Sequence, residues 1–380
     1  MSDKKKILFI ISGLGVGGAE IALRNLLYGL KDDFNIKIVS LTQVDDIAAE
    51  IKAYGITVHQ LNFKQLYLLS LQIYKFISII LKFKPDILQG WMYHGNLFAC
   101  IAKFFSYKTT KLFLGIRQSL KGLSTEKRAT RLAIRLDALA SSKVADKIIY
   151  NSYSGMEEHE KYGYAKQHGI VIYNGFDINL FSPNREQHKL LCEELNIAQD
   201  SYLIGIIARY HPVKDHKTFI HAAQILLRDH RNTHFIMVGE GVTTDNKDLA
   251  QLISRYNIPK NNMHLLGLRK DISAITSGLD IATNCSLSEG AANSMCEALS
   301  CGVLCVATDV GDSKKIIGEC GLIIPTSSSH ELANAWRNII DMPKNRYEQL
   351  SYTARQKIIK QLSMEAMILK YKALFMGEDI

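Results

Sequence analysis

The chain of 380 residues is 47% hydrophobic and 22% charged, a composition that excludes a disordered or fibrous protein. Its length is sufficient for two domains of ordinary size. Seven cysteines, an odd number, favour a reducing compartment over a disulfide framework. The apolar run from Ile7 to Ile11 is too short for a secretory signal. We therefore expect a cytoplasmic, globular protein with two domains.

The formal net charge of +9 lies entirely in the first half of the chain. Residues 1–180 contain 24 Lys and Arg against 15 Asp and Glu, whereas the rest of the chain is balanced. Such an asymmetry indicates an acidic partner for the first half. Nucleic acid, anionic lipid and a diphosphate-bearing acceptor are all partners of this kind.

The first half begins with a predicted strand at 5–11, a glycine loop at 13–18 and a helix at about 19–30. This order is typical of a phosphate-binding site, and the glycine spacing matches the dinucleotide fingerprint G-x-G-x-x-G. A nicotinamide site also needs an acidic residue at the end of the second strand. That strand is predicted at 35–41, and the nearest acid, Asp45, lies in the loop beyond it. Nicotinamide binding is therefore the weaker alternative.

The rest of the first half alternates between helix and strand, which predicts a parallel sheet covered on both faces. The expected helices are 48–54, 66–83 and 95–105, and the expected strands are 57–61, 86–90, 111–115, 147–150 and 169–173. The helix at 66–83 is close to membrane-spanning length, but Lys75 interrupts it. A crossover helix, or one with a face resting on a bilayer, is the better interpretation.

Two further features of the first half are candidates for function. His94 follows the strand at 86–90, and ligands bind at the carboxyl ends of parallel strands. A structural histidine is the alternative for this position. Arg128, Arg131 and Arg135 share one face of a helix by their i+3 and i+4 spacing, although a solvated face is the usual explanation.

The second half is predicted to contain another parallel sheet, with strands at 202–208, 235–238, 264–266, 279–282 and 304–308. Arg209 and Lys214 follow the first of these strands and precede a helix at 218–227. An arginine offers a bidentate contact and a lysine a point charge, so this pair can bind a diphosphate. The candidate residues of this half fall at the carboxyl ends of strands, where the crevice of an open sheet lies.

The segment from Asn284 to Gly302 is predicted to be a polar loop followed by a helix at 294–300. It contains two carboxylates, Glu289 and Glu297, which can accept hydrogen bonds from sugar hydroxyls. Small residues lie between them and let backbone amides approach a phosphate at the helix N-terminus; they are Gly290, Ala291, Ala292, Asn293 and Ser294. A nucleotide-sugar carries both kinds of group, although a loop with two solvated glutamates is the alternative.

Metal binding finds no support in the sequence. The cysteines form no C-x-x-C pair, and the chain has no Asp-x-Asp to hold Mg²⁺ against a diphosphate. The positive groups that bind a diphosphate must then be Arg209, Lys214 and the helix dipole. We expect no metal site and no resident cofactor.

With these residues assembled, nearly the whole chain resembles a family 4 retaining glycosyltransferase of the GT-B fold. Four motifs carry the resemblance: the glycine loop Gly15-Val16-Gly17-Gly18-Ala19-Glu20, the turn Asn174-Gly175-Phe176-Asp177, the clamp Arg209 and Lys214, and the E-x₇-E pair Glu289 and Glu297. The resemblance implies an α/β protein of two doubly wound, Rossmann-like domains facing each other across a cleft. Residues 1–180 would bind the acceptor, 181–363 the nucleotide-sugar, and 364–380 would form a helix that crosses back.

The resemblance also implies roles for individual residues. Glu297 would hold the ribose, and Glu289 would contact the transferred sugar together with the amides of residues 290–294. Leu268 and Arg269 lie in the loop that reads the base, and His94 sits beside the sugar. Gly15, Gly17 and Gly18 would line the donor. The sequence departs from the family pattern at two places. Asp215 stands where a glycine is commoner. Ala291-Ala292 replace a bulky residue and a proline in the sugar pocket, so the identity of the sugar is not predicted.

The implied reaction is transfer of a hexose from a UDP-sugar, with retention and without a metal. The basic first half suits a lipid-linked acceptor or a lipopolysaccharide core. The resemblance further implies a peripheral protein on the inner face of the cytoplasmic membrane. Its pathway would be the bacterial biosynthesis of a cell-surface polysaccharide, capsule or glycolipid. A nucleotide-sugar 2-epimerase of the same fold and a nicotinamide-dependent oxidoreductase stay as alternatives. Because no aromatic residues interleave the basic run after Arg117, we expect no nucleic-acid partner.

Overall fold

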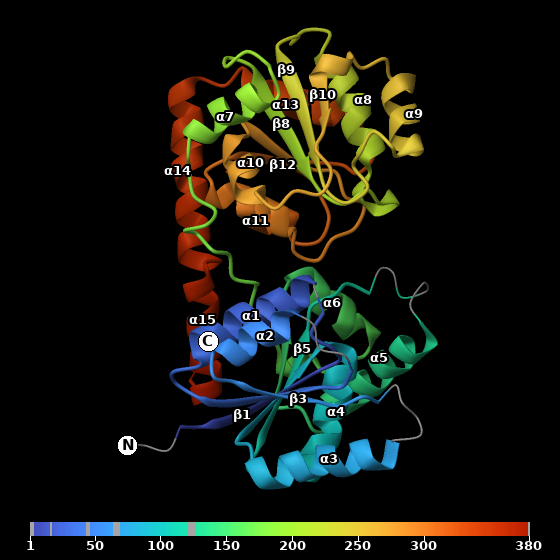
Figure 1. The fold of residues 1–380 in the computed structure, drawn as a ribbon, viewed down its shortest axis with the longest axis vertical. Helices are drawn as coiled ribbons and strands as arrows, with labels where there is room; N and C mark the ends of the chain where they lie inside the picture. The colour runs from blue at the N-terminus through green and yellow to red at the C-terminus, as the bar shows by residue number, and fades with distance from the viewer. Residues whose placement is uncertain are drawn as a thin grey trace. The chain divides into compact units, whose positions relative to one another are not determined.

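The computed structural model describes residues 4–15, 17–42, 46–63, 69–120, 123 and 127–378. The chain divides into two compact units. Unit 1 contains Met1–Gly175 and Met364–Ile380, and unit 2 contains Phe176–Ser363. Each unit is a parallel sheet with helices on both faces (Figure 1). The boundary predicted after residue 180 lies a few residues beyond the division found here.

Unit 1 is built on a seven-stranded sheet in the order β3-β2-β1-β4-β5-β6-β7. Every neighbouring pair of these strands is parallel. The central strands are almost wholly buried, as expected for a sheet covered on both faces. The strands are β1 (Lys6–Ile11), β2 (Asn35–Ser40), β3 (Thr57–Gln60), β4 (Ile87–Trp91), β5 (Lys111–Ile116), β6 (Lys147–Tyr150) and β7 (Gly169–Val171).

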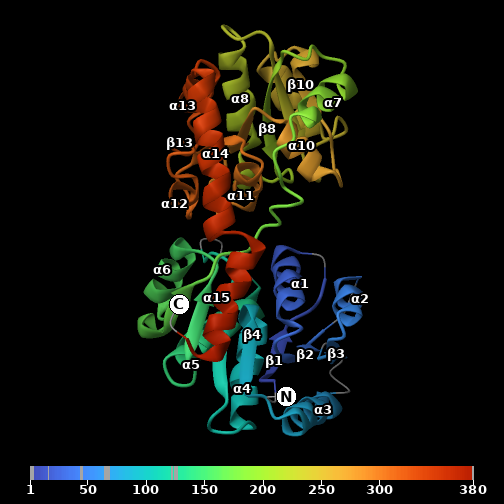
Figure 2. The same cartoon turned by 90° about the vertical axis from the view of Figure 1, so that its left-hand side faces the viewer.

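Two hydrophobic clusters cover the faces of this sheet. The first is formed with α1 (Gly18–Leu30), α2 (Asp46–Ala53) and the last helix, α15 (Met364–Met376). The second is formed with α3 (Leu69–Phe83), α4 (Met92–Phe104) and α5 (Arg128–Ser141), while α6 (Tyr153–Tyr162) and the short η3 (Lys166–His168) precede β7. Figure 2 shows α15 alongside α1. The end of the chain therefore completes the core of its first part.

The ring of Phe375 illustrates how α15 enters this core. Its centroid lies 6.2 Å from that of Phe9, 5.9 Å from that of Phe34 and 5.9 Å from that of Phe113. These rings come from β1, the loop before β2, and β5. Burial of large aromatic side chains is among the strongest contributions to a core, so unit 1 depends on residues far away in the sequence.

Unit 2 is built on a six-stranded parallel sheet in the order β10-β9-β8-β11-β12-β13. Trp336 lies at the centre of its core, 5.2 Å from Phe219 by ring centroids, and donates a hydrogen bond to Thr283 Oγ1 at 3.0 Å. The strands are β8 (Tyr202–Ile207), β9 (Thr233–Val238), β10 (Met263–Leu265), β11 (Ile281–Asn284), β12 (Leu304–Thr308) and β13 (Gly321–Ile324). The helices are α7 (Glu186–Glu194), η4 (Pro212–Lys214), α8 (His216–Leu226), α9 (Lys247–Arg255), η5 (Lys260–Asn262), α10 (Ile272–Gly278), α11 (Asn293–Ser300), α12 (Ser313–Ile317), α13 (Ser329–Ile340) and α14 (Lys344–Gln361).

Two predicted elements differ from the structure at the sites that matter for function. The strand expected at 279–282 is β11, which begins at Ile281, because the Asp280 carboxylate accepts the Leu203 amide at 2.8 Å before the strand starts. Asn284 is therefore the last strand residue and not part of the loop. The helix expected from residue 95 is α4, which begins at Met92 directly after β4. His94 thus lies in the first turn of a helix.

The apolar helix predicted at 66–83 is α3, which the structure describes from Leu69 onward. Its first predicted residues lie outside the described ones. Within the described parts of the chain, no helix is both long enough and apolar enough to cross a membrane. The core-facing side chains of α3 are Gln72, Phe76, Ile80 and Phe83.

Candidate active site

The loop after β8 carries the two predicted cations of unit 2. Arg209 is exposed, and no partner of its side chain is recorded among the described residues. Lys214 ends the 3₁₀ turn η4 and is half-buried. The next residue, Asp215, has φ 46° and ψ 51°, which is the left-handed conformation that favours glycine. The family's usual glycine is thus replaced at a position that requires a positive φ.

Asp215 offsets this strain by capping α8. Its carboxylate accepts the Thr218 amide at 3.2 Å and the Thr218 hydroxyl at 2.6 Å. A cap of this kind contributes about 1 kcal/mol, similar to the cost of a left-handed non-glycine residue. The departure noted in the sequence therefore keeps the backbone that presents Lys214.

Lys214 reaches across to the loop that follows β11. Its Nζ contacts Glu289 Oε1 in an ion pair whose side chains are 26% and 15% exposed. Ser286 Oγ donates a hydrogen bond of 2.7 Å to the same carboxylate oxygen. Two of the predicted catalytic residues, 75 positions apart, are thus brought into direct contact. Partial burial makes their attraction stronger than that of an exposed pair.

The loop that carries Glu289 is held by a series of hydrogen bonds. The Ser286 amide donates to Asn284 Oδ1 at 2.9 Å, and the Ser286 carbonyl accepts from Thr308 Oγ1 at 2.6 Å. The Leu287 amide donates to the Val213 carbonyl at 2.8 Å, which ties this loop to the Lys214 loop. Both loops leave the carboxyl edge of the sheet from neighbouring strands, β8 and β11.

The turn after β12 supports the other side of the same loop. The Asp312 amide donates to the Gly290 carbonyl at 3.1 Å. Gly311 has φ 56°, and a Cβ there would lie 2.4 Å from the Gly290 carbonyl oxygen and 2.5 Å from that of Glu289. Only a glycine permits this approach.

The helix α11 begins at Asn293, immediately after the small residues of the loop. Its N-cap is Ala292, and no side chain caps it. The first amides of a helix lack intrahelical acceptors, so those of Asn293 and Ser294 are available to a ligand. Together with the positive end of the helix dipole they can hold an anion. Gly290 and Ala291 lie in the loop that leads to this end.

Glu297 lies one turn into α11. Burial raises the pKa of its carboxyl to about 7, because the charged form loses hydration. A carboxylate with unused acceptor capacity in such a place gains most when hydroxyl groups donate to it. Glu297 is therefore suited to a diol such as ribose, and its protonation will compete with that contact near neutral pH.

Leu268 and Arg269 follow β10 at the same edge of the sheet. Leu268 is exposed, whereas the Arg269 guanidinium is bound to the Asp271 and Glu194 carboxylates, each at 2.5 Å. These contacts raise the pKa of Arg269. The preceding Gly267 has φ 64°, which turns the chain here. The loop thus exposes its backbone and Leu268 to a ligand, whereas the Arg269 side chain is engaged in ion pairs that stabilise the loop.

The remaining predicted residues lie in unit 1. Gly15, Gly17 and Gly18 lie in or at the end of the loop between β1 and α1, with Gly17 as the N-cap in extended conformation; Val16 lies outside the described residues. His94 follows β4, the direct neighbour of β1. Burial lowers the pKa of His94, which favours the neutral imidazole.

Arg117, a half-buried arginine just before the basic run, was given no role in the sequence analysis, but the structure gives it several contacts. The guanidinium of Arg117 lies 4.0 Å from the ring centroid of Trp91. It donates to Tyr371 Oη at 2.5 Å and also to Asn174 Oδ1. Arg117 therefore joins the turn at Asn174, where the first stretch of unit 1 ends, to helix α15. Ser286 was missed as well, because a lone serine near a glutamate gives no signal in sequence.

Two parallel sheets covered by helices, with the candidate residues of unit 2 at its carboxyl edge, are the architecture of the GT-B fold, and family models identify the class as glycosyltransferase. Residues 16–180 match the profile described as Glycosyltransferase Family 4, and residues 201–342 match that described as Glycosyl transferases group 1. The chain belongs to glycosyltransferase family 4. These matches reach into both units and include Gly17, Gly18, His94, Arg209, Lys214 and both glutamates.

Similar proteins agree with this assignment. The protein described as glycosyltransferase EpsF of Bacillus subtilis is 23% identical over 94% of this chain and 95% of its own length. A UDP-Gal:alpha-D-GlcNAc-diphosphoundecaprenol alpha-1,3-galactosyltransferase of Escherichia coli is 24% identical over 66% of this chain and 65% of its own. The crystal structure of Anabaena Alr3699/HepE in complex with UDP has a TM-score of 0.85 at 21% identity, covering 98% of this chain and all of that one, and shows the same fold.

Proposed function

We propose that the protein is a retaining hexosyltransferase that moves a sugar from a UDP-sugar to a lipid-linked or polysaccharide acceptor. The observation that carries the proposal is the contact between Lys214 and Glu289 beside the uncapped N-terminus of α11. A cation, free amides and a carboxylate then meet at one edge of a sheet. This combination of groups is what binding a diphosphate linked to a sugar requires.

In this proposal the chain stabilises the leaving group. The bond between the anomeric carbon and the β-phosphate oxygen breaks, and its electron pair goes to the phosphate. Arg209, Lys214 and the amides at the start of α11 stabilise the charge that develops there. The acceptor hydroxyl bonds to the same face of the sugar and passes its proton to the leaving phosphate. Glu289 holds the transferred sugar, and Glu297 holds the ribose.

The proposed acceptor follows from the relatives and from the charge of unit 1. One relative is named for a diphosphoundecaprenol acceptor. The excess positive charge of residues 1–180 suits such a diphosphate and an anionic membrane surface. We place the protein in the cytoplasm, peripherally on the inner face of the membrane, in the synthesis of lipopolysaccharide, capsule or a related glycan.

The outer side of α5 supports the membrane part of the proposal. Arginines and leucines recur there at helical spacing and are exposed: Arg128, Arg131, Leu132, Arg135, Leu136 and Leu139. A face of this composition can enter the headgroup region while its arginines contact lipid phosphates. On the same side of the sheet, α3 also exposes apolar side chains, which are Leu71, Ile73, Tyr74 and Leu81.

The direct test is an assay with a panel of UDP-sugars and a synthetic polyprenyl-diphosphate sugar as acceptor. We expect UDP release only with acceptor present, a product with the anomeric configuration of the donor, and full activity in excess EDTA. An epimerised free sugar nucleotide, or UDP released without a glycoside, would instead indicate the 2-epimerase. A structure from Listeria monocytogenes that is described as a UDP-N-acetylglucosamine 2-epimerase shares the fold of this chain at TM-score 0.63 and 15% identity. Inversion, or loss of activity on chelation, would contradict the proposed mechanism.

A further inference from the structure

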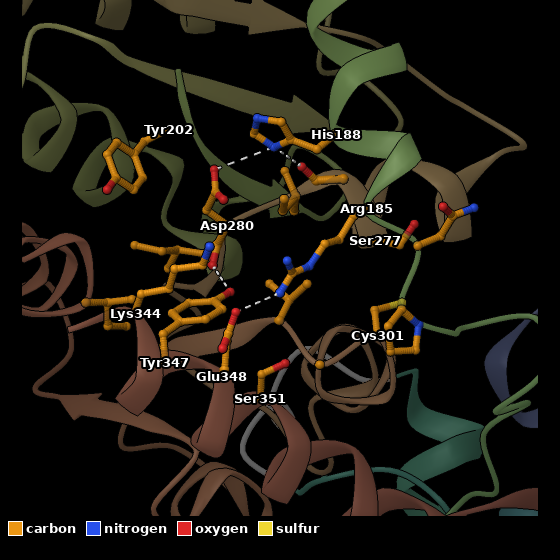
Figure 3. Close-up of a pocket in the computed structure, with 18 of the residues that line it drawn as sticks. Arg185, His188, Tyr202, Ser277, Asp280, Cys301, Lys344, Tyr347, Glu348 and Ser351 are labelled. Carbon is orange, nitrogen blue, oxygen red and sulfur yellow. Dashed lines mark hydrogen bonds and ion pairs between the residues drawn. The ribbon is translucent and has the colours of Figure 1, made fainter. Parts of the chain in front are cut away.

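Unit 2 contains a cavity of about 510 Å³ that none of the candidate donor-site residues lines (Figure 3). It lies at the amino edge of the sheet, where Tyr202 begins β8, Ile281 begins β11 and Val303 precedes β12. The candidate donor residues follow the carboxyl ends of these strands. In a parallel sheet all amino ends share one edge, so the cavity and the donor site lie on opposite edges of unit 2.

Part of the lining of the cavity is aliphatic. Its aliphatic lining comes from the segment before β11, the segment before β12 and the end of α13: Leu279, Ile281, Val303, Ile339, Ile340 and Met342. A volume of this size is within the range of pockets for small ligands. The shape and lining suit a compact ring or branched aliphatic body.

The charged and histidine side chains that line the cavity, here called its rim, are largely paired with one another. Arg185 extends toward Glu348 and forms an ion pair at 3.1 Å (Figure 3). His188 places Nδ1 3.0 Å from the Gly278 carbonyl and 3.7 Å from the Asp280 carboxylate. These contacts account for both carboxylates of the lining.

Two lysines of the rim are left over. Lys189 on α7 and Lys344 at the start of α14 both line the cavity, and no ion pair or hydrogen bond of either side chain is recorded among the described residues. With the carboxylates already engaged, the rim has a surplus of positive charge. An anionic group on a ligand can contact either lysine without displacing an existing partner.

We propose that this cavity is a second ligand site, for a small amphipathic anion with an aromatic or branched aliphatic body and one carboxylate, sulfonate or phosphate group. The body occupies the apolar lining and the anionic group pairs with Lys189 or Lys344. Binding there leaves the donor site open, because β11 separates the two edges by four residues, or roughly 13 Å.

The probe for the test is 8-anilinonaphthalene-1-sulfonate, which combines an aromatic body with one sulfonate and fluoresces when it leaves water. Its dissociation constant is measured for the full-length protein with and without saturating UDP. We expect unchanged binding with UDP, and weaker binding of N-phenyl-1-naphthylamine, the same body without the sulfonate. Displacement of the probe by UDP would overturn the proposal and leave the donor-site assignment intact.

The variants localise the probe. Lys189→Gln/Lys344→Gln should weaken its binding about tenfold, as expected for the loss of a charge-assisted contact. Ser277→Trp, which fills the cavity without changing charge, should do the same. The matched control Lys247→Gln/Lys260→Gln removes two exposed lysines of the same unit that do not line the cavity. Equal binding by the cavity variants and the control, with unfolding midpoints unchanged, would show that the probe binds elsewhere and would overturn the proposal.

Discussion

Lys214 and Glu289 form an ion pair that joins the loop after β8 to the loop after β11. The pair is supported by Ser286, whose hydroxyl donates to the same carboxylate oxygen at 2.7 Å. Lys214 ends the 3₁₀ turn η4 and Glu289 lies in an irregular loop, and the ion pair holds the two side chains against each other. The residue proposed to bind the diphosphate and the one proposed to bind the sugar are therefore positioned by each other.

Arg209→Ala and Lys214→Ala should each lower kcat/KM by about 100-fold or more, because each removes a charge beside the leaving diphosphate. Steady-state rates with the best UDP-sugar check this. Lys217→Ala removes an exposed lysine from the same stretch and should leave the rate within about twofold, as surface substitutions usually do. Near-normal rates for both site variants would show that the diphosphate binds elsewhere.

Asp215→Ala should destabilise the protein by about 1–2 kcal/mol, since alanine keeps the left-handed strain and loses the α8 cap. Asp215→Asn retains both the cap and a tolerance for this conformation, and it should cost far less. Urea unfolding gives the free energies. A larger loss for the asparagine variant than for the alanine variant would contradict this explanation of the family departure.

Much of the fold could be predicted from the sequence, for a physical reason. Strands of a sheet covered on both faces are short, continuous apolar runs, so β1 and β12 stand out between polar or glycine-rich segments. β13 (Gly321–Ile324) was not predicted, because four residues with one glycine carry little signal. The early start of α4 was missed since Trp91 offers no capping side chain and Met92 has φ 66°.

The candidate site could be predicted only in part. Its residues were identified through a resemblance carried by motifs, each local in sequence. The contacts that position them are not local: Lys214 and Glu289 are 75 residues apart, and Arg117 and Tyr371 are 254 apart. The periodicity of apolar residues in a sequence does not indicate contacts between residues so far apart. The ion pair of Arg269 with Glu194 could not be predicted from sequence either, because Glu194 belongs to a different element, α7.

Donor affinity should depend on the protonation of Glu297. Its pKa is raised to about 7, so the protonated form grows as the pH falls below neutrality and can no longer accept from both ribose hydroxyls. UDP should therefore bind more weakly at pH 6 than at pH 8. Glu297→Gln carries no titrating group, and its profile should show only the titration of UDP itself. Identical profiles for the two proteins would exclude Glu297 from the ribose site.

The same shift predicts the sign of a stability effect. A carboxyl whose pKa is higher in the folded than in the unfolded state binds its proton more tightly when folded. Its stabilising contribution is then complete below the unfolded pKa and is lost as the pH rises through about 7. Glu297→Gln should thus raise the unfolding midpoint relative to wild type more at pH 8 than at pH 5. A larger gain at pH 5 would contradict the burial of this group.

The outer face of α5 should bind anionic vesicles. The triple change Arg128→Glu/Arg131→Glu/Arg135→Glu removes three cations that each contribute about 1 kcal/mol near a charged leaflet. Flotation with phosphatidylglycerol vesicles should show binding by the wild type, weakened by salt and lost in the triple variant. A control with Lys52→Glu/Lys161→Glu/Lys166→Glu makes the same charge change elsewhere on unit 1 and should retain more binding. Binding that ignores lipid charge would indicate a soluble acceptor.

The most direct test of the donor site is calorimetric titration of UDP and of the UDP-sugar into the wild type, Glu297→Ala and Glu289→Ala. The two carboxylates lie on different parts of one segment, Glu297 on α11 and Glu289 in the loop before it. We predict that Glu297→Ala weakens both ligands, whereas Glu289→Ala leaves UDP binding nearly intact and removes the additional affinity conferred by the sugar. Equal losses of UDP affinity in the two variants would contradict the division of the site into a ribose end and a sugar end.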